Sequence, residues 1–273
     1  MNFKMLPFIW MESRSVLVSS VHTARPREVT YYQFPELSRY EGLAHAVFTR
    51  HGGVSRSPYD TLNTSYATGD APESVRINLQ TIKAAIGANG LRYMNQIHGQ
   101  NVIILDHAGS HDFRRPPEAD AMITKQANLA LMVKQADCQA VILFDPEKRV
   151  VSIVHCGWRG NTYHILESVV KRMESDFGSQ ESELRAAIGP SLGPCCAEFK
   201  NYEEIFPEDF MRFMVRENYF NLWELSRWQL MEAGLQKENI EIAGLCTRCR
   251  TDLFYSYRGE GVTGRFATVV MLK

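Results

Sequence analysis

The chain has 273 residues, enough to bury a core as one large domain or two small ones. Its 30 basic and 31 acidic side chains leave a net charge of −1, and no basic run stands out, so we do not expect nucleic-acid binding. The longest apolar runs are strand-sized, and Pro7, Glu12 and Arg14 interrupt or close the first of them, so we expect a cytoplasmic protein rather than a secreted or membrane-bound one.

Apolar periodicity and turn residues predict the elements along the chain. Residues 73–86 follow Pro72 and precede Gly87, which is typical of a helix, and residues 221–233 begin with a pattern resembling a capping box. In chain order we expect a helix at 73–86, a strand at Val102–Leu105, a surface loop at His107–Glu118, strands at Leu129–Val133, Ala140–Phe144 and Val150–His155, helices at 165–177 and 221–233, and strands at Ile240–Leu245, Leu253–Tyr257 and Phe266–Leu272.

The order of these elements indicates the fold class. Three consecutive strands are separated by short turns, such as residues 145–148, and the helices lie elsewhere in the chain. Hairpin-connected strands with separate helices favour an α+β fold with mixed sheets over a regular βαβ repeat. Because no repeat or linker interrupts the chain, we predict a single domain at 1–273, in which 1–41 forms an N-terminal segment.

Three polar segments place possible metal ligands at predicted strand ends. His98 precedes one strand, Cys138 precedes another, and His155 closes a third; strand alternation points Cys156 to the opposite face from His155. Two imidazoles and a thiolate suit zinc, and three protein ligands leave a fourth position for water or substrate. The separations of 40 and 17 residues match no short zinc-ribbon spacing, so a hydrogen-bonded histidine and a core cysteine remain alternatives.

The remaining cysteines carry a weaker signal. Cys246 and Cys249 form a C-x-x-C with no second pair nearby in sequence, which favours a structural turn over a separate metal site. Adjacent residues such as Cys195 and Cys196 are poorly placed to chelate together, so packing is the simpler interpretation. Trp158 could stack on an aromatic ligand, although packing in the core is more usual.

Several segments together resemble the YfiH/laccase-domain family, whose members were once called multicopper polyphenol oxidases and are now regarded as purine nucleoside phosphorylases. The resemblance runs in order from about residue 42 to the C-terminus and is carried by FTRHGGVS (48–55), LNTS (62–65), NQIHG (95–99), ADC (136–138), HCGWRG (155–160), IGPSLGPCC (188–196), CTRC (246–249) and FYSYRGEGVTGR (254–265). Two positions depart from the family pattern. Cys156 replaces a small residue after the third ligand, and Gly259 follows Arg258 where the family has a second arginine.

The resemblance implies a YfiH-like α+β domain in which His98, Cys138 and His155 form a catalytic zinc site, with copper as an alternative metal. It also implies phosphorolysis of adenosine, inosine and methylthioadenosine to the free base and ribose 1-phosphate or its 5-methylthio analogue, together with adenosine deamination. The implied partners are purine nucleosides and inorganic phosphate, and the chain is expected as a monomer or homodimer. A metal-activated water is the nucleophile that deamination requires.

Three more residues are candidates for the same site. Arg50 lies in a Gly-rich turn and is a candidate phosphate clamp, with backbone amides of Gly52 and Gly53 assisting. Arg258 is a second phosphate candidate, although a solvated or structural role suits either arginine equally well. Asp137 is a candidate proton acceptor, or a carboxylate that orients a metal ligand.

Other functions are weighed on the same residues. A multicopper oxidase needs roughly ten histidine ligands, many in H-x-H pairs; this chain has 8 histidines and no such pair, so laccase activity is rejected. Two alternatives remain open. One is a metal-free cysteine hydrolase or deamidase with Cys138 as nucleophile and His155 as base. The other is a non-catalytic binding protein stabilised by zinc.

Overall fold

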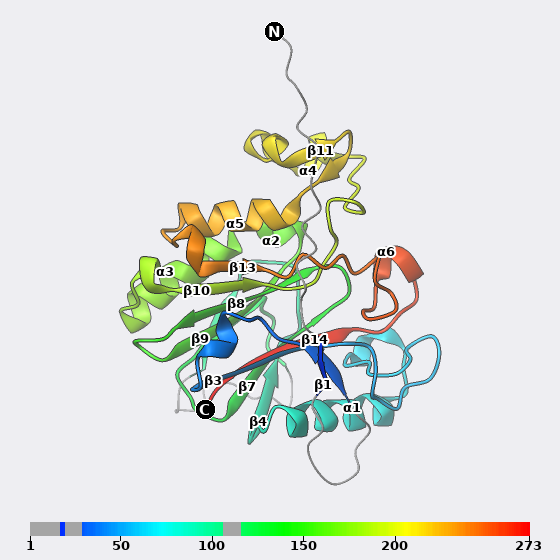
Figure 1. Ribbon diagram of the computed structural model, residues 1–273. Coiled ribbons are helices and arrows are strands. Elements are labelled where there is room, and N and C mark those ends of the chain that lie inside the picture. The colour runs from blue at the N-terminus through cyan, green and yellow to red at the C-terminus, as the bar shows by residue number, and fades with distance from the viewer. Residues whose placement is uncertain (1–16, 20–28, 106–115) are drawn as a thin grey trace.

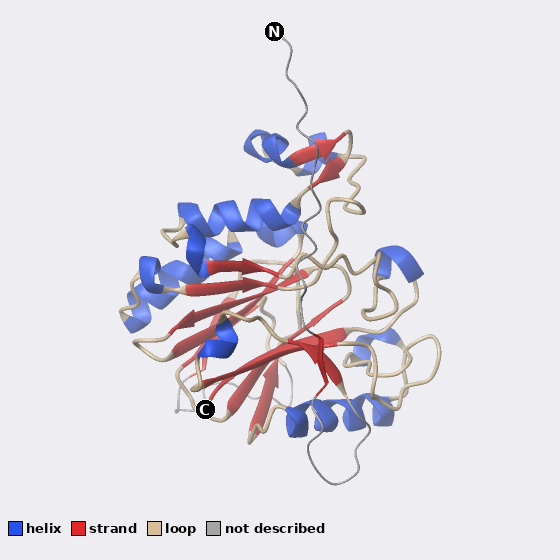
Figure 2. Cartoon of the chain, in the orientation of Figure 1, coloured by secondary structure: helices blue, strands red, loops and turns tan. Residues whose placement is uncertain are grey.

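The computed structural model describes residues 17–19, 29–105 and 116–273. Outside this part lie residues 1–16 and 20–28 of the N-terminal segment and residues 107–115 of the expected surface loop. The fold is α+β, as predicted: two six-stranded mixed sheets, with helices on the outer side of each (Figures 1 and 2). Among the described helices, none combines the length and apolar character needed to cross a membrane.

Strands distant in sequence are neighbours in each sheet. The first sheet has the spatial order β1 (Leu17–Ser19), β2 (Thr30–Tyr32), β3 (Leu43–Phe48), β14 (Phe266–Leu272), β7 (Leu129–Gln135) and β4 (Gly90–Tyr93). The second has the order β13 (Ile240–Ile242), β10 (Arg185–Ile188), β8 (Gln139–Asp145), β9 (Val150–Cys156), β6 (Ala121–Thr124) and β5 (Val102–Leu105). A small ribbon pairs β11 (Met214–Arg216) with β12 (Tyr219–Phe220). The pairs β4–β7, β5–β6 and β10–β13 are parallel.

The three helices predicted from the sequence are α1, α3 and α5 of the structure. The α-helices are α1 (Pro72–Ala85), α2 (Trp158–Thr162), α3 (Ile165–Phe177), α4 (Tyr202–Ile205), α5 (Leu222–Glu232) and α6 (Tyr257–Glu260). The 3-10 helices are η1 (Leu37–Arg39), η2 (Tyr66–Thr68), η3 (Glu181–Glu183), η4 (Glu208–Phe213) and η5 (Lys237–Asn239). Pro72 opens α1; Asn221 caps α5 by accepting a hydrogen bond from the Glu224 amide; Gly178 ends α3 with a φ of 68°. The three predicted helices are therefore confirmed.

Alternation along β8 and β9 divides the core into layers. One face of each strand packs in the space between the two sheets, and its members are Ala140, Ile142, Phe144, Val151 and Ile153. The other face packs against α3 and α5, and its members are Val141, Leu143, Val150, Val154 and Cys156. Because both faces of these strands are covered, their sequences are continuous apolar runs and do not alternate between apolar and polar residues. On the far side of the molecule, α1 covers the outer face of the first sheet.

Two strand predictions are corrected by the structure. Residues 253–256 form a turn and irregular backbone that lead into α6 at Tyr257, although 253–257 were predicted as a strand. Phe254 and Tyr255 are fully buried here. The apolar character of these residues therefore reflects burial and not a strand conformation. The expected run of three hairpin-connected strands is also wrong in part. β8 pairs with β9, whereas β7 belongs to the other sheet.

The chain therefore crosses from the first sheet to the second between β7 and β8, and it does so again between β4 and β5. Cys138 lies in the first of these crossovers, and His98 lies in the second. His155 is on β9, on the face that looks between the sheets by alternation with Ile153. The layered architecture thus brings three distant residues to one end of the inter-sheet space.

Candidate metal centre

His98, Cys138 and His155 converge on one point. Their ligand atoms, a ring nitrogen from each histidine and the thiol sulfur, lie within 4.8 Å of one another. The two imidazole rings meet edge to face, with centroids 4.8 Å apart. Zinc bound at about 2.0–2.3 Å by such ligands would need donor atoms roughly 3.3–3.8 Å apart. The spacing of this His/Cys/His cluster therefore fits a single ion after small side-chain adjustments.

The orientation of His155 is fixed by Asp120. The Nδ1 atom of His155 lies 2.8 Å from Oδ1 of Asp120, and both side chains are buried. A carboxylate only accepts, so Nδ1 carries the hydrogen and Nε2 is left to face the cluster. A carboxylate behind a metal-binding histidine is a recurrent way of fixing the tautomer and raising ligand basicity.

Asp120 also holds the loop that carries His98. Its carboxylate accepts hydrogen bonds from the backbone amides of Ile97, His98 and Gly99, at 3.3, 3.0 and 2.7 Å. His98 itself has a φ of 57°, a left-handed conformation that is uncommon outside glycine. One carboxylate thus positions two of the three ligands. Asp120 was not among the residues predicted from the sequence, because the short strand β6 that follows it was not predicted either.

Gly157 leaves the space that the cluster needs. A Cβ atom at this position would lie 2.9 Å from the Cys138 sulfur and 3.6 Å from Cδ2 of His98. Its φ of −81° is open to any residue, so the requirement for glycine here is spatial rather than conformational. The glycine that follows His155 and Cys156 in the sequence is therefore part of the site.

The charges in the cluster favour a thiolate. Burial alone would raise the pKa of the Cys138 thiol, but the charges and hydrogen bonds of His155 and His98 lower it to about 6. Burial would lower the pKa of His155, yet Cys138 and Asp120 raise it to about 9. Cys156 differs: burial raises the pKa of its thiol, and it packs in the core beneath α3. Of these two cysteines, Cys138 is therefore the one whose surroundings favour the anion.

The cluster opens into a cavity of about 510 Å³, within the usual range for a small-molecule site. Its wall contains four cationic side chains, namely Lys134, Arg159, Arg258 and Arg265. It also contains three aromatic ones, namely Trp158, Phe199 and Tyr257. Trp158 lines this cavity and packs edge to face on Phe206, so its packing is observed and its stacking on a ligand stays a prediction. Burial lowers the pKa of Lys134 to about 8. The cavity therefore joins a possible metal site to anion-binding and ring-stacking groups.

Asp137 and Arg258 both line this cavity and are linked to each other. The Asp137 carboxylate accepts from the backbone amide of Arg258 at 2.6 Å, and from the hydroxyls of Thr247 and Ser256 at 2.7 Å each. The Arg258 guanidinium donates to the carbonyl of Glu198 at 2.8 Å. Asp137 thus holds the start of α6, and with it Arg258, against the cavity.

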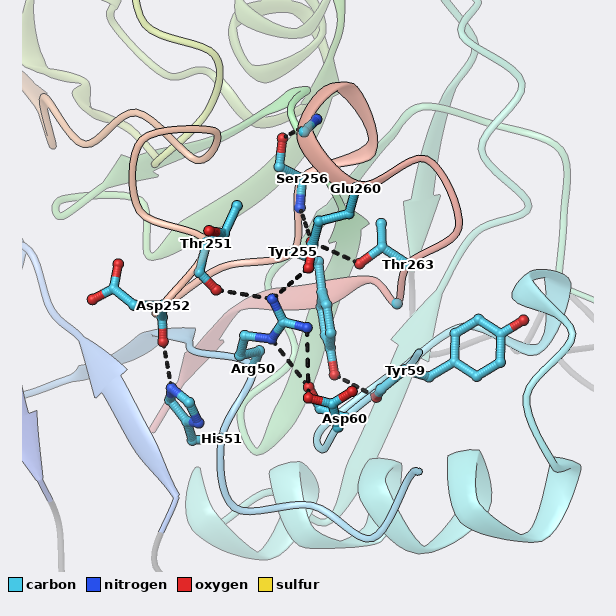
Figure 3. A network of polar contacts seen from close by, with 12 residues as sticks. Arg50, His51, Tyr59, Asp60, Thr251, Asp252, Tyr255, Ser256, Glu260 and Thr263 are labelled. Carbon is cyan, nitrogen blue, oxygen red and sulfur yellow. Dashed lines mark hydrogen bonds and ion pairs between the residues drawn. The ribbon is translucent and has the colours of Figure 1, made fainter. Parts of the chain in front are cut away.

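Arg50 is not brought to the cavity. Its guanidinium donates to the carbonyls of Asp60 and Thr251 at 3.0 and 2.8 Å, and it pairs with Glu260 at 2.8 Å (Figure 3). It also lies over the Tyr255 ring, 4.6 Å from the centroid. This network ties the Gly-rich turn to the segment before α6 and, through Glu260, to α6 itself.

Four other cysteines gather elsewhere. The Cys195–Cys196 pair lies close to the Cys246 and Cys249 pair, with all four sulfurs within 4.8 Å of one another. The C-x-x-C has no second pair nearby in sequence, but the fold brings Cys195 and Cys196 to it from about fifty residues upstream. Within the described residues, the His/Cys/His cluster and these four cysteines are the two groups of this kind.

Comparison with known proteins identifies relatives along most of the chain. A family model described as multi-copper polyphenol oxidoreductase laccase matches residues 44–273. A Bacteroides thetaiotaomicron protein named purine nucleoside phosphorylase is 30% identical over 258 residues, which cover 88% of this chain and 95% of that protein. A Corynebacterium glutamicum protein of the same name is 33% identical over 231 residues, covering 82% and 92% of the two chains.

Solved structures agree with the fold. The Bacillus licheniformis hypothetical protein YfiH superposes with a TM-score of 0.80 at 26% identity, covering 91% of this chain and 97% of that one. YlmD from Geobacillus stearothermophilus also gives 0.80, at 25% identity, covering 94% and 100%. The resemblance found in the sequence is therefore confirmed at the level of family and architecture.

Proposed function

The chain belongs to the family described as multi-copper polyphenol oxidoreductase laccases, and we propose that it is a metal-dependent purine nucleoside phosphorylase acting through a single catalytic domain. The observation that carries this proposal is the convergence of His98, Cys138 and His155 beside a cavity lined with cations and aromatic rings. Relatives that bear the name purine nucleoside phosphorylase support the substrate class. One mononuclear cluster of this kind does not supply the several copper sites of a laccase.

Zinc is the metal we propose, with copper as a substitute. A thiolate of lowered pKa and two imidazoles are a borderline-soft donor set, and Gly157 leaves the space in which they approach one another. Three protein ligands leave one position open, which is the arrangement of catalytic rather than structural zinc. Such a metal would supply a Lewis acid and a means of activating water.

The residues around the cluster have separable roles in the proposal. The cationic side chains of the cavity, Arg258 among them, hold phosphate so that one of its oxygens reaches C1′ of the ribose. A bond forms between that oxygen and C1′ as the glycosidic bond breaks, the purine takes up a proton from water and leaves as the free base, and ribose 1-phosphate remains. Trp158, Phe199 and Tyr257 line the cavity, and we expect the purine to stack on one of these rings. Asp137 acts as a positioning residue, because its oxygens already accept three hydrogen bonds.

We further propose adenosine, inosine and methylthioadenosine as substrates, together with deamination of adenosine. These assignments follow from the family resemblance. The cavity volume of about 510 Å³ leaves room for a nucleoside and phosphate together. Deamination requires a water at C6 of the purine, whereas phosphorolysis requires phosphate at C1′, so the two reactions would need different substrate poses.

The decisive experiment incubates the zinc-loaded protein with adenosine or inosine, with and without phosphate. Phosphate-dependent release of the free base and ribose 1-phosphate is expected, and inosine formed from adenosine without phosphate would establish deamination. If zinc is bound and neither nucleoside is consumed, the proposed function is wrong.

Two arginine variants provide a matched comparison. Arg258→Ala removes a cavity cation, so we expect the KM for phosphate to rise about tenfold or more with the fold intact. Arg50→Ala breaks the buried network before α6, so it should lower the unfolding temperature and leave the KM for phosphate in the remaining folded protein nearly unchanged. A higher KM for phosphate in Arg50→Ala and an unchanged KM in Arg258→Ala would indicate that Arg50, and not Arg258, binds phosphate.

A metal-free cysteine hydrolase is the second candidate, and one observation favours it. The pKa of Cys138 near 6, below that of His155 near 9, describes a thiolate–imidazolium pair of the kind used by nucleophilic cysteine enzymes. Hydrolase activity that survives complete metal removal would support this candidate. Activity that disappears with zinc and returns on its addition would exclude it.

A further inference from the structure

The four-cysteine cluster, made of Cys195, Cys196, Cys246 and Cys249, has the geometry of a metal-binding site. All its sulfurs lie within 4.8 Å of one another, and Cys249 is 3.6 Å from both Cys195 and Cys196. Four thiolates arranged tetrahedrally at about 2.3 Å from a zinc ion would be about 3.8 Å apart. All four side chains are free thiols. The observed spacing is thus close to that of ligands around one ion.

The fold brings the two pairs together by joining their loops through backbone hydrogen bonds. The loop that follows β10 and the loop that follows β13 pair at Ser191 and Cys246. The Ser191 amide donates to the carbonyl of Leu245 at 3.2 Å, and the Thr247 amide donates to the carbonyl of Ser191 at 3.0 Å. The second loop has the C-x-x-C spacing that is common for structural zinc. Cys195 and Cys196 are adjacent, an unfavourable spacing for chelation, yet the fold places both sulfurs within 4.8 Å of the other two.

Gly193 allows the close approach of the two loops. A Cβ atom at this position would lie 3.0 Å from Cβ of Cys246 and 2.8 Å from the Trp223 ring. On the other loop, the amide of Arg250 donates to the carbonyl of Cys246 at 3.0 Å, which closes a turn around the C-x-x-C. Both loops are therefore shaped so that their sulfurs face one another.

From this geometry we propose that the four-cysteine cluster holds a second zinc ion in a closed, structural site. Four thiolates satisfy the coordination of the ion completely, so no position remains for substrate. Sulfur ligands select zinc, iron or cuprous copper over magnesium or calcium. Arg248 lies within the C-x-x-C and Arg216 donates to the carbonyl of Cys195, so positive charge is available near an anionic cluster. The proposal does not depend on the chemistry at the His/Cys/His cluster.

The site would fasten part of the cavity wall. Leu192 and Phe199, which flank the first cysteine pair, line the cavity, and the Leu192 amide donates to the carbonyl of Asp137 at 2.9 Å. Arg258 follows the second pair and reaches back to the carbonyl of Glu198 at 2.8 Å. A metal shared by the two loops would therefore hold both sides of this wall at a fixed separation.

Metal content of the whole chain, purified under reducing conditions with zinc supplied, tests the proposal. We expect about two zinc ions per chain in the unaltered protein and about one in Cys249→Ser, whose side chain is exposed. Cys138→Ala should also retain about one ion, at the four-cysteine cluster. The control Cys156→Ala, which changes a core cysteine outside both groups, should retain both ions. A lower unfolding temperature is expected for Cys249→Ser than for this control.

Cobalt reports the ligand set without relying on a variant that must fold. Replacement of zinc by cobalt in the unaltered chain should give strong sulfur-to-cobalt charge-transfer absorption, which mostly persists in Cys138→Ala and falls in Cys249→Ser to the weaker absorption of the single Cys138 thiolate. Three results would overturn the proposal. The first is about one zinc per chain together with all 6 cysteine thiols reacting in a thiol titration. The others are disulfides among the four cysteines in the reduced preparation, and iron with inorganic sulfide in place of zinc.

Discussion

Replacing Asp120 by asparagine should weaken metal binding at the His/Cys/His cluster without removing any ligand. One carboxylate oxygen faces Nδ1 of His155 at 2.8 Å, and the other accepts from the Gly99 amide at 2.7 Å. An asparagine keeps one acceptor oxygen, but its amide nitrogen would oppose a backbone or ring N–H. Leaving such a buried donor unpaired costs about 1–3 kcal/mol.

The expected effect on affinity follows from this loss. Changing the partner of a metal-binding histidine lowers metal affinity by about 10–100-fold, which corresponds to about 1.4–2.7 kcal/mol. The two ranges agree, so we expect the dissociation constant for zinc at this cluster to rise by about 10–100-fold. Competition with a chromogenic chelator measures it, best in a Cys249→Ser background that reports on this cluster alone.

Asp145→Asn is the matched control. Asp145 is also a buried carboxylate that accepts from backbone amides, those of Glu147 and Lys148 at 2.9 Å each, in the turn between β8 and β9. Both amides donate to the same oxygen, so an asparagine keeps both hydrogen bonds, and the zinc affinity should be unchanged. An unaltered zinc affinity in Asp120→Asn, or an equal loss in both variants, would refute the assignment of Asp120 as the residue that positions the ligands.

Three further predictions concern the cluster and the core. Gly157→Ala should weaken zinc binding about tenfold or more, because the added carbon would press on the Cys138 sulfur. The control Gly42→Ala should leave zinc binding unchanged, because its added carbon meets only the end of an arginine side chain. In metal-free protein, alkylation of Cys138, followed by peptide mass spectrometry, should rise with pH through a midpoint near 6. Burial lowers the pKa of His45 from 6.5 to about 4, so the unfolded chain binds the proton between those values and the folded protein does not. The free energy of unfolding should therefore fall by about 3 kcal/mol more between pH 7 and 4 in the unaltered protein than in His45→Gln.

Each of these has an outcome that contradicts it. Equal zinc affinity in the two glycine variants would mean that the ligand loops yield easily to an added methyl group. An alkylation midpoint above 8 would place Cys138 in an ordinary thiol environment. Parallel pH profiles of unfolding, measured by denaturant titration, would show that His45 takes up its proton in the folded protein as well.

The sequence by itself determined the elements whose signals are local. The helices at 73–86 and 221–233 were predicted from apolar spacing and from their end residues, and the hairpin of β8 and β9 from two apolar runs around a turn. The three ligands of the proposed metal site came from the family resemblance rather than from their spacing, because residues 40 and 17 positions apart carry no local signal of proximity.

Tertiary structure alone decided which distant groups meet. Burial made residues 253–257 look like a strand, although 253–256 form a turn and irregular backbone, because a sequence pattern records apolar character and not backbone direction. Asp120 contacts two of the ligands because β6 pairs with β9. Arg50 lies in a hydrogen-bonded network with Glu260 and does not line the cavity. The two cysteine pairs met only because β10 and β13 are neighbours in the second sheet. Distances between remote residues are set by strand order, and strand order depends on packing across the whole molecule.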